Sequence, residues 1–314
     1  MRYYFAPLEG LTDSIYRKLH HKYFPGITQY YTPFISPTVH RALTPREARE
    51  LPPADTLDFK VVPQLLTKSP EDFLWMAGQC RDLGYCEVNL NLGCPSGTVT
   101  AKGKGAGMLN DLDALDRFLS SIFSAAPLDI SIKTRLGFSS SEEFPRLLDI
   151  FNRYPVKELT VHPRVRNAFY NGSVDMDAFR YALDHSHVPV CYNGNLYTRE
   201  QLDNVSCQFP KISALMLGRG LIADPGMLSP GETDVKTLER FYDELLEEYT
   251  QAFGGSRNAM FRLKENWRYL ICKFEGGEKL AKRLRKTTDL REYKAITKEI
   301  FHTLPLRNDV AANW

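Results

Sequence analysis

Cys94 is the residue of this sequence whose type and surroundings are best suited to chemistry. It lies in the segment Asn-Leu-Gly-Cys-Pro at residues 91–95, and a glycine-rich stretch follows at residues 103–107. A free cysteine is often a small buried apolar residue rather than a catalyst. We assign that role to the other five cysteines, Cys80, Cys86, Cys191, Cys207 and Cys272. From its position alone, Cys94 fits either class.

Two short motifs are suited to holding a phosphate group. Residues 193–195 read Asn-Gly-Asn and residues 218–220 read Gly-Arg-Gly. Glycine lets backbone N–H groups approach a phosphate closely, and Arg219 supplies a forked cationic donor. A phosphorylated cofactor or substrate is therefore predicted. The second motif also fits a loose dinucleotide-binding pattern, but no strand ending in an acidic residue follows about 20 positions later, which disfavours a Rossmann domain.

The elements that must position these motifs alternate between strands and helices. Apolar residues recur at helical spacing over residues 70–83, 112–123, 142–154 and 176–185. Asp72 and Asp111 are residue types typical of helix starts. Eight runs rich in β-branched and aromatic residues predict strands at residues 3–6, 27–32, 60–65, 86–91, 129–134, 158–162, 188–193 and 214–218. This alternation predicts an α/β fold, a (β/α)₈ TIM barrel, with a doubly wound parallel sheet as the alternative.

In such a barrel, catalytic side chains gather at the carboxyl ends of the strands. Polar residues do end several predicted strands, although a single lysine or arginine there is usually a solvated loop residue. Their joint occurrence at one rim favours a ligand site, because a barrel interior has little room for unpaired charge. These residues are Gln64, Asn91, Lys133, Arg135, His162 and Arg164.

Composition indicates an ordinary globular chain of 314 residues with 43% hydrophobic and 25% charged residues. No apolar stretch reaches the ~20 residues that a membrane span needs, and the amino terminus does not resemble a signal peptide. The cysteines show neither zinc-ligand spacing nor a disulfide framework. We therefore expect a cytoplasmic protein without a metal site or membrane contact, and a monomer.

The last eighty residues differ in character from the rest. A Pro/Gly break at residues 228–232 is followed by apolar residues at helical spacing without a strand signal. Residues 257–286 hold ten Lys or Arg against three Glu, a suitable footprint for nucleic-acid phosphates, although a solvated helix face would look similar. We predict a barrel domain over residues 1–234 and a small helical domain over residues 235–314.

Taken together and in order, the motifs resemble those of the tRNA-dihydrouridine synthases. Any one of them is weak, because other flavin barrels share Asn-Gly-Asn and Gly-Arg-Gly, but the ordered set covers the whole barrel. The matching segments are Phe-Ala-Pro-Leu-Glu-Gly-Leu-Thr-Asp at 5–13, Asn-Leu-Gly-Cys-Pro at 91–95, Lys-Gly-Ala-Gly-Met-Leu at 104–109, Lys-Thr-Arg-Leu-Gly at 133–137, His-Pro-Arg at 162–164, Asn-Gly-Asn at 193–195 and Met-Leu-Gly-Arg-Gly at 216–220.

The resemblance implies FMN as cofactor and a nicotinamide cofactor, NADPH or NADH, as reductant. The flavin ring would lie against Ala6, Pro7 and Leu8, with Gln64 and Lys133 bonded to it. The residues implied for the phosphate are His162, Asn193, Gly194, Asn195, Gly218 and Arg219.

The resemblance also implies the substrate and its ligands. Specific uridines of tRNA would be reduced at the C5–C6 double bond, with Asn91 and Arg164 holding the uracil and Cys94 donating a proton to C5. A free thiol has a pKa of about 8.5 and is mostly protonated at neutral pH, as this role requires. The helical tail, including Arg262 and Lys264, would bind tRNA.

The sequence departs from the common family pattern in the loop after His162. Pro163 stands where a glycine is more usual, and Ala168 replaces a glutamine. The insert at residues 36–58 carries no recognisable signal.

Two alternatives remain. One is an FMN barrel acting on a free pyrimidine, which would not explain the basic tail, and the other is a non-catalytic tRNA-binding protein on a barrel scaffold. The sequence specifies neither the uridine position nor the choice between NADPH and NADH.

Overall fold

The computed structural model describes residues 1–38, 40–231, 233–307 and 310. Its sheet contains nine parallel strands, paired in the order β3-β2-β1-β9-β8-β7-β6-β5-β4. Apart from β3 and β4, strands that follow one another in the chain are therefore neighbours in the sheet. The strands are β1 Arg2–Phe5, β2 Gln29–Tyr31, β3 Val61–Val62, β4 Gln64–Leu65, β5 Glu87–Leu92, β6 Asp129–Arg135, β7 Leu159–His162, β8 Val190–Tyr192 and β9 Ala214–Leu217.

The two ends of this strand order are successive parts of one segment, and this closes the sheet. β3 pairs with β2, whereas β4, which is separated from β3 by a single residue, pairs with β5. Pro63 lies between them, and its carbonyl accepts the N–H of Asn89 at 2.8 Å. Eight barrel strands result, which confirms the (β/α)₈ prediction and rules out the doubly wound alternative.

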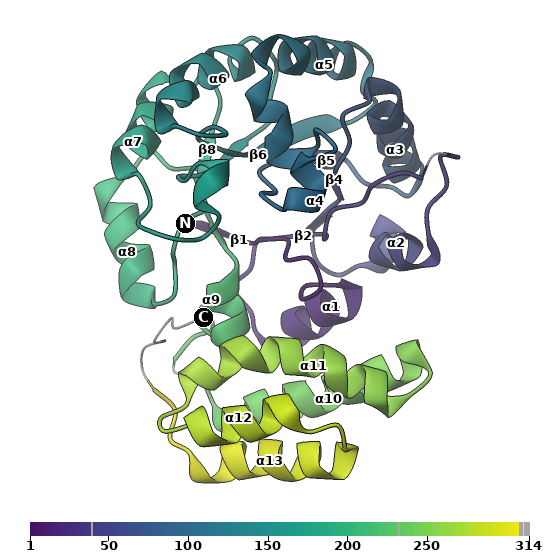
Figure 1. The fold of residues 1–314 in the computed structure, drawn as a ribbon, viewed down its shortest axis with the longest axis vertical. Helices are drawn as coiled ribbons and strands as arrows, with labels where there is room; N and C mark the ends of the chain where they lie inside the picture. The colour runs from purple at the N-terminus through teal and green to yellow at the C-terminus, as the bar shows by residue number, and fades with distance from the viewer. Residues whose placement is uncertain (39, 232, 308–309, 311–314) are drawn as a thin grey trace. The chain divides into compact units, whose positions relative to one another are not determined.

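Helices surround the strands of the barrel (Figure 1), and all four predicted helical segments are present. Asp111 begins its helix as predicted, accepting the N–H of Ala114. The other predicted start is displaced, because Ser69 rather than Asp72 caps the first of these helices. The helices here are α2 Pro45–Glu50, α3 Pro70–Asp82, α4 Gly97–Thr100, α5 Leu112–Ala125, α6 Phe144–Phe151, α7 Met176–His185 and α8 Arg199–Gln208, with single 3₁₀ turns η1 Ala54–Thr56, η2 Gly105–Asn110, η3 Ser141–Glu143 and η4 Arg166–Ala168.

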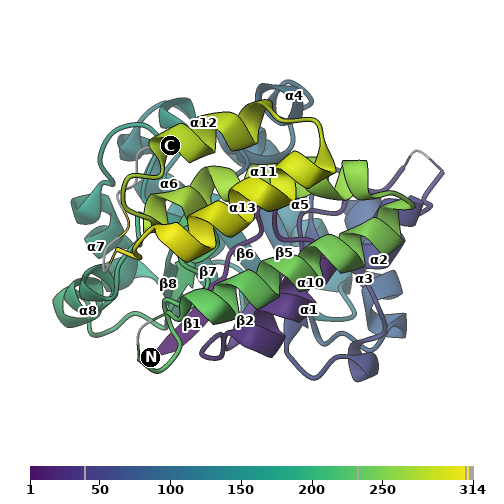
Figure 2. The ribbon, with the colours of Figure 1, turned by 90° about the horizontal axis from the view of Figure 1, so that it is seen from below.

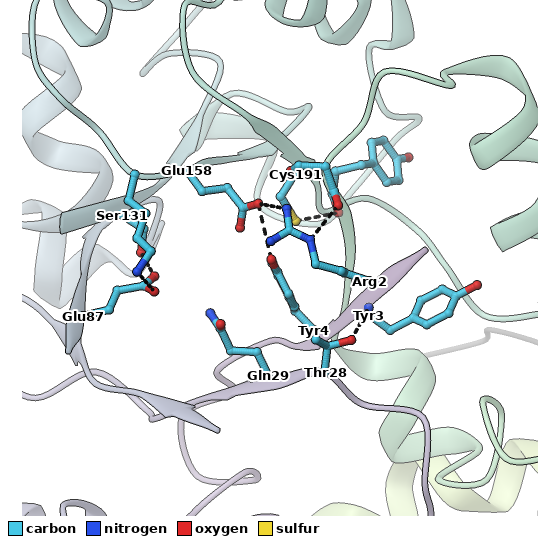
Figure 3. A network of polar contacts seen from close by, with 12 residues as sticks. Arg2, Tyr3, Tyr4, Thr28, Gln29, Glu87, Ser131, Glu158 and Cys191 are labelled. Atoms are coloured by element: carbon cyan, nitrogen blue, oxygen red, sulfur yellow. Dashed lines mark hydrogen bonds and ion pairs between the residues drawn. The ribbon is translucent and has the colours of Figure 1, made fainter. Parts of the chain in front are cut away.

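Polar side chains lie at the amino end of the barrel. Glu158 is buried and accepts hydrogen bonds from Arg2 at 2.9 Å and from Tyr4 at 3.3 Å (Figure 3). Glu87, also buried, accepts the hydroxyl of Ser131 at 2.8 Å. Apolar side chains pack within the barrel as one cluster, made of Tyr4, Ala6, Tyr31, Val62, Cys191, Ala214 and Met216.

The chain divides into two compact units. The first comprises Met1–Pro7, Thr28–Asn195 and Val205–Met216, and the second comprises Leu8–Ile27, Leu196–Asn204 and Leu217–Trp314. The second unit is helical, and in it α1 and α11 both pack against α10 (Figure 2). Its helices are α1 Ser14–Tyr23, α9 Arg219–Ala223, α10 Val235–Phe253, α11 Ser256–Leu270, α12 Glu278–Lys286 and α13 Leu290–Thr303, with the 3₁₀ turn η5 Ile271–Lys273.

The carboxyl-terminal region is thus helical, as the apolar spacing predicts. Trp267 is buried at its centre and donates its indole N–H to the hydroxyl of Tyr293 at 2.9 Å. The predicted domain boundary after residue 234 stays a prediction. Val39 of the 36–58 insert, Glu232 of the predicted break and residues 308–309 and 311–314 lie outside the described residues.

Two ion pairs of Lys157 at the amino end of the barrel allow a stability prediction in which one pair is the control for the other. Lys157 contacts both Glu87, at 3.1 Å, and Asp129, at 2.8 Å, but their side chains are 5% and 62% exposed. Glu87→Ala should lower the free energy of unfolding by about 2–4 kcal/mol, because Ser131 and Lys157 lose a buried partner. Asp129→Ala should cost less than about 1 kcal/mol. Urea unfolding followed by circular dichroism measures both, and equal losses would contradict the assignment.

Candidate active site

Asn91 shapes the turn that carries Cys94. It lies near the carboxyl end of β5, and its side-chain oxygen accepts the backbone N–H groups of Gly93 at 3.1 Å and Cys94 at 2.9 Å. An asparagine side chain bonded to the following backbone is a common way to fix a tight turn. The position of Cys94 therefore depends directly on Asn91.

Asn91 is itself held by Gln64. Its side-chain nitrogen donates to the Gln64 oxygen at 2.7 Å, and the Gln64 nitrogen donates to Asn89 at 2.8 Å. Asn89 then donates to Ser131 at 3.0 Å, and Ser131 donates to Glu87. We call these five residues the polar ladder. They run from one end of β5 to the other and bring together two predicted site residues, Gln64 and Asn91.

The glycine-rich loop after Cys94 packs against it. Gly105 has a φ of +57°, and a Cβ placed on it would lie 3.1 Å from the Cβ of Cys94. The N–H of the next residue, Ala106, donates to the Cys94 carbonyl at 3.1 Å. Glycine is required here both for its backbone conformation and for the close approach. Cys94 is therefore held from two sides, by Asn91 and by the Gly105 loop.

Arg135 is a site residue that the strand-end pattern indicates but that the predicted ligand set omits. Its guanidinium donates to the carbonyl of Gly93 at 2.9 Å and to the carbonyls of Val165 at 3.0 Å and Phe169 at 2.7 Å. Arg135 is buried, so these bonds replace hydration. It joins the Cys94 turn to the loop that follows β7. The available signal was its spacing of two from Lys133, which puts both on one face of β6.

Lys133 lies beside Asn91, on the adjacent strand in register with it. Burial and, secondly, the positive charge of Arg135 lower the pKa of Lys133 from 10.5 to about 8. No ion pair joins Lys133 to a carboxylate among the residues that the structure describes. A cation in this setting is stabilised by an anionic ligand.

Predicted phosphate and uracil ligands meet at the end of β7. Arg164 is 3.0 Å from the Nε2 of His162 and donates to the side-chain oxygen of Asn195 at 3.3 Å. Because a guanidinium only donates, His162 accepts in this contact. Arg164 also donates to the carbonyls of Asn171 and Gly172. Arg164 is therefore the donor that links His162, Asn195 and the loop at residues 171–172.

Other predicted residues of the first unit follow neighbouring strands. Asn193 follows β8 and donates to the carbonyl of Met216 at 2.8 Å. Gly194 approaches Tyr192 so closely that a Cβ on it would lie 2.0 Å from the tyrosine hydroxyl oxygen, so only glycine fits there. Ala6 and Pro7 follow β1 directly, and Ala6 is buried.

The second unit holds the remaining predicted residues. Leu8 donates its N–H to the hydroxyl of Thr12 at 2.9 Å. Gly218 immediately precedes α9, whose first residue, Arg219, donates to the hydroxyl of Tyr197 at 2.8 Å. Gly220 fits closely, since a Cβ on it would lie 2.1 Å from the carbonyl oxygen of Leu196.

The two tail residues predicted to bind tRNA are both bonded within the second unit. Arg262, with 18% of its side chain exposed, pairs with Asp13 and donates to the carbonyl of Gly10. Lys264 donates to the carbonyl of Thr287 at 2.7 Å. Each of them therefore also supports the fold of its own unit.

Comparison with known proteins identifies the family. The model of the family described as "Dihydrouridine synthase (Dus)" matches residues 4–303. The chain belongs to the dihydrouridine synthase family. This places it among the flavin-dependent oxidoreductases that act on tRNA uridines, as the ordered motifs predict.

Individual relatives agree with this assignment. A "Probable tRNA-dihydrouridine synthase 1" from Synechocystis sp. is 25% identical, covering 96% of this chain and 86% of the relative. A "tRNA-dihydrouridine(16) synthase" from Shigella flexneri is 30% identical, covering 72% of this chain and 74% of the relative. Among solved structures, morphinone reductase has a TM-score of 0.50 at 12% identity, covering 76% of this chain and 85% of that one, which supports the barrel fold alone.

Among the residues that the structure describes, no group of three or more His, Cys, Asp or Glu side chains is placed to hold a metal ion. None of the described helices is long and apolar enough to span a membrane.

The surroundings of Lys133 predict an unusual titration. In the protein without ligand, competitive labelling with acetic anhydride should show Lys133 half-neutral near pH 8, whereas an ordinary lysine titrates near pH 10.4. The shift arises because burial and Arg135 both disfavour the charged form. Mass spectrometry of the peptide measures the label, with Lys133→Arg as the blank. A midpoint near the ordinary value would show that the site is more polar than described.

Proposed function

We propose that this protein uses FMN, reduced by NADPH, to reduce the C5–C6 double bond of specific uridines in tRNA, with Cys94 as the proton donor to C5. The observation that carries the proposal is the construction of the Cys94 turn. Asn91 bonds the backbone of Cys94, and Lys133 lies beside Asn91 on the next strand. A thiol and a cation are thus fixed at the carboxyl end of adjacent barrel strands, where a barrel holds its chemistry.

The residues present fit an FMN group. Lys133 suits the negative charge of a reduced ring, and Arg219, a cation at the first position of α9, suits a phosphate. When bound, the flavin would supply the hydride. The residues proposed to bind it are Ala6, Pro7, Leu8, Gln64 and Lys133 for the ring, and His162, Asn193, Gly194, Asn195, Gly218 and Arg219 for the phosphate.

The proposed roles of Cys94, Asn91 and Arg164 concern the uracil. The Asn91 oxygen already accepts two backbone N–H groups, so Asn91 would bind uracil through its side-chain nitrogen. Arg164 would donate to a uracil carbonyl. Cys94 would give its thiol proton to C5 and recover one from solvent, a general-acid step that needs the thiol protonated beforehand.

A tRNA partner agrees with the charge of the tail. Four exposed cations of α12 form no ion pair among the described residues, namely Lys279, Lys282, Arg285 and Lys286. Such cations can bind phosphates at little cost to the fold. We propose that they act together with Arg262 and Lys264 in a helical tRNA-binding domain over residues 235–314. We further propose that the protein acts as a monomer in the cytoplasm, on a barrel domain over residues 1–234.

The whole proposal is tested by position-by-position mapping of dihydrouridine in tRNA. The purified protein should be yellow and release FMN on denaturation, and with NADPH it should form dihydrouridine at specific positions of unmodified tRNA. A colourless protein would remove the flavin assignment. A flavoprotein without measurable tRNA affinity at low salt would favour a free pyrimidine as substrate.

Replacing the thiol should separate chemistry from binding. Cys94→Ala should keep bound flavin and tRNA affinity but lose about 10²-fold or more of dihydrouridine formation, since a general acid contributes that much. The sequence prediction that Cys207 is buried is wrong, because its side chain is exposed, as is that of Cys86. Cys207→Ala is therefore the matched control and should behave as the unchanged protein. Single-turnover assays with prereduced enzyme measure the step. Unchanged turnover by Cys94→Ala would remove Cys94 from the mechanism.

Removing the cation at the start of α9 should weaken cofactor retention. Arg219→Ala should release FMN at least ~10-fold more readily, because a charge-assisted phosphate contact is lost. Tyr197→Phe is the control, since it removes the hydroxyl that Arg219 contacts and leaves the cation in place. Flavin fluorescence on dilution measures the release. Full flavin occupancy in Arg219→Ala would contradict the phosphate role.

A further inference from the structure

The loop after β7 exposes two aromatic side chains. Phe169 is 40% exposed and Tyr170 is 48% exposed, in a loop bounded by η4. Phe169 has a φ of +51° and a ψ of −105°, and it is one of only two non-glycine residues with positive φ in the described part of the chain. A bulky residue in this region is strained. Its exposed ring is thus held where the backbone alone would not place it.

Two arginines hold Phe169 in place. Arg135 donates to its carbonyl at 2.7 Å, and the guanidinium of Arg166 lies 5.2 Å from the centre of its ring. Arg166 lies equally close to the ring of Phe138, and it donates to the hydroxyl of Thr100 at 2.9 Å. The strain persists only because these contacts determine the loop.

The same contacts place Phe169 beside the Cys94 turn. One guanidinium, that of Arg135, bonds the carbonyl of Phe169 and also the carbonyl of Gly93, the residue before Cys94. Thr100, which Arg166 contacts, ends the short helix α4 that follows the Cys94 turn. An exposed aromatic residue is therefore linked through its carbonyl and Arg135 to the segment that carries Cys94, and its ring lies against the guanidinium that contacts α4.

A tRNA uridine can reach that acid only if it leaves its stack, which exposes the face of a neighbouring base. We infer that Phe169 stacks on the nucleobase adjacent to the target uridine and so replaces the contact that the uridine gives up. Arg166 beneath the ring adds a cation near the RNA backbone. An aromatic ring stacks on any base, so the contact favours extrusion without fixing the sequence. This inference rests on the proposed function and assigns a substrate contact within it.

The test replaces the ring while respecting the backbone. Phe169→Gly accommodates the positive φ, so the thermal midpoint should be unchanged or higher. Its kcat/KM for dihydrouridine formation in tRNA should fall roughly 5- to 100-fold, the loss expected for one stacked base. Flavin content and the rate of flavin reduction by NADPH should match the unchanged protein. Phe169→Trp should restore activity, and Phe253→Ala, at an exposed aromatic of α10, should have no effect.

A binding measurement independent of turnover completes the test. With 2-aminopurine next to the target uridine, the unchanged protein and Phe169→Trp should quench its fluorescence, and Phe169→Gly should not. Unchanged kcat/KM and quenching in Phe169→Gly would overturn the inference. Loss of flavin in that variant would also overturn it, because the ring would then support the fold. No dihydrouridine formation by the unchanged protein would instead contradict the proposed function, whatever the quenching shows.

Discussion

Closure of the parallel sheet on residues 61–65 is the constraint on which the site depends. This short segment pairs with β2 through its first half and with β5 through its second half. The second half also carries Gln64, whose side chain bonds Asn91 and Asn89 on β5. The same five residues therefore close the barrel and orient the amide that fixes the Cys94 turn. The closed barrel and the position of the Cys94 turn therefore depend on one set of contacts.

The polar ladder explains how the Cys94 turn is held at the carboxyl end of β5. Its buried members each find a partner along β5 and its neighbours, from Asn91 at one end to Glu87 at the other. Buried amides that are fully bonded have few alternative orientations, whereas unbonded ones would be costly. The side-chain oxygen of Asn91 can then accept the N–H groups of the turn, while its side-chain nitrogen can donate to a ligand.

The cations at the carboxyl ends of β6 and β7 differ in the groups to which they are bonded. Arg135 and Arg164 donate hydrogen bonds to backbone carbonyls and so fix loops. The ammonium group of Lys133 instead pairs with no carboxylate among the described residues. Burial penalises all three charges, and an anionic ligand offsets that penalty. In the second unit the same residue type again holds a loop, since Arg262 bonds Gly10 and Asp13. In Arg135, Arg164 and Arg262 the guanidinium thus joins separate segments of the chain.

The amino-acid sequence by itself indicated the eight strands, four of the barrel helices, the helical tail and the family. Apolar runs and glycine-rich strand ends are local signals, and the Cys94 motif is read without knowledge of its neighbours. Only the tertiary structure decided what depends on residues far apart in the chain. Gln64 meets Asn91, and Arg135 reaches Phe169, because barrel closure makes successive strands neighbours. The positive φ of Phe169 could not be predicted for the same reason, since it is imposed by contacts with β6 and α4 rather than by the phenylalanine itself.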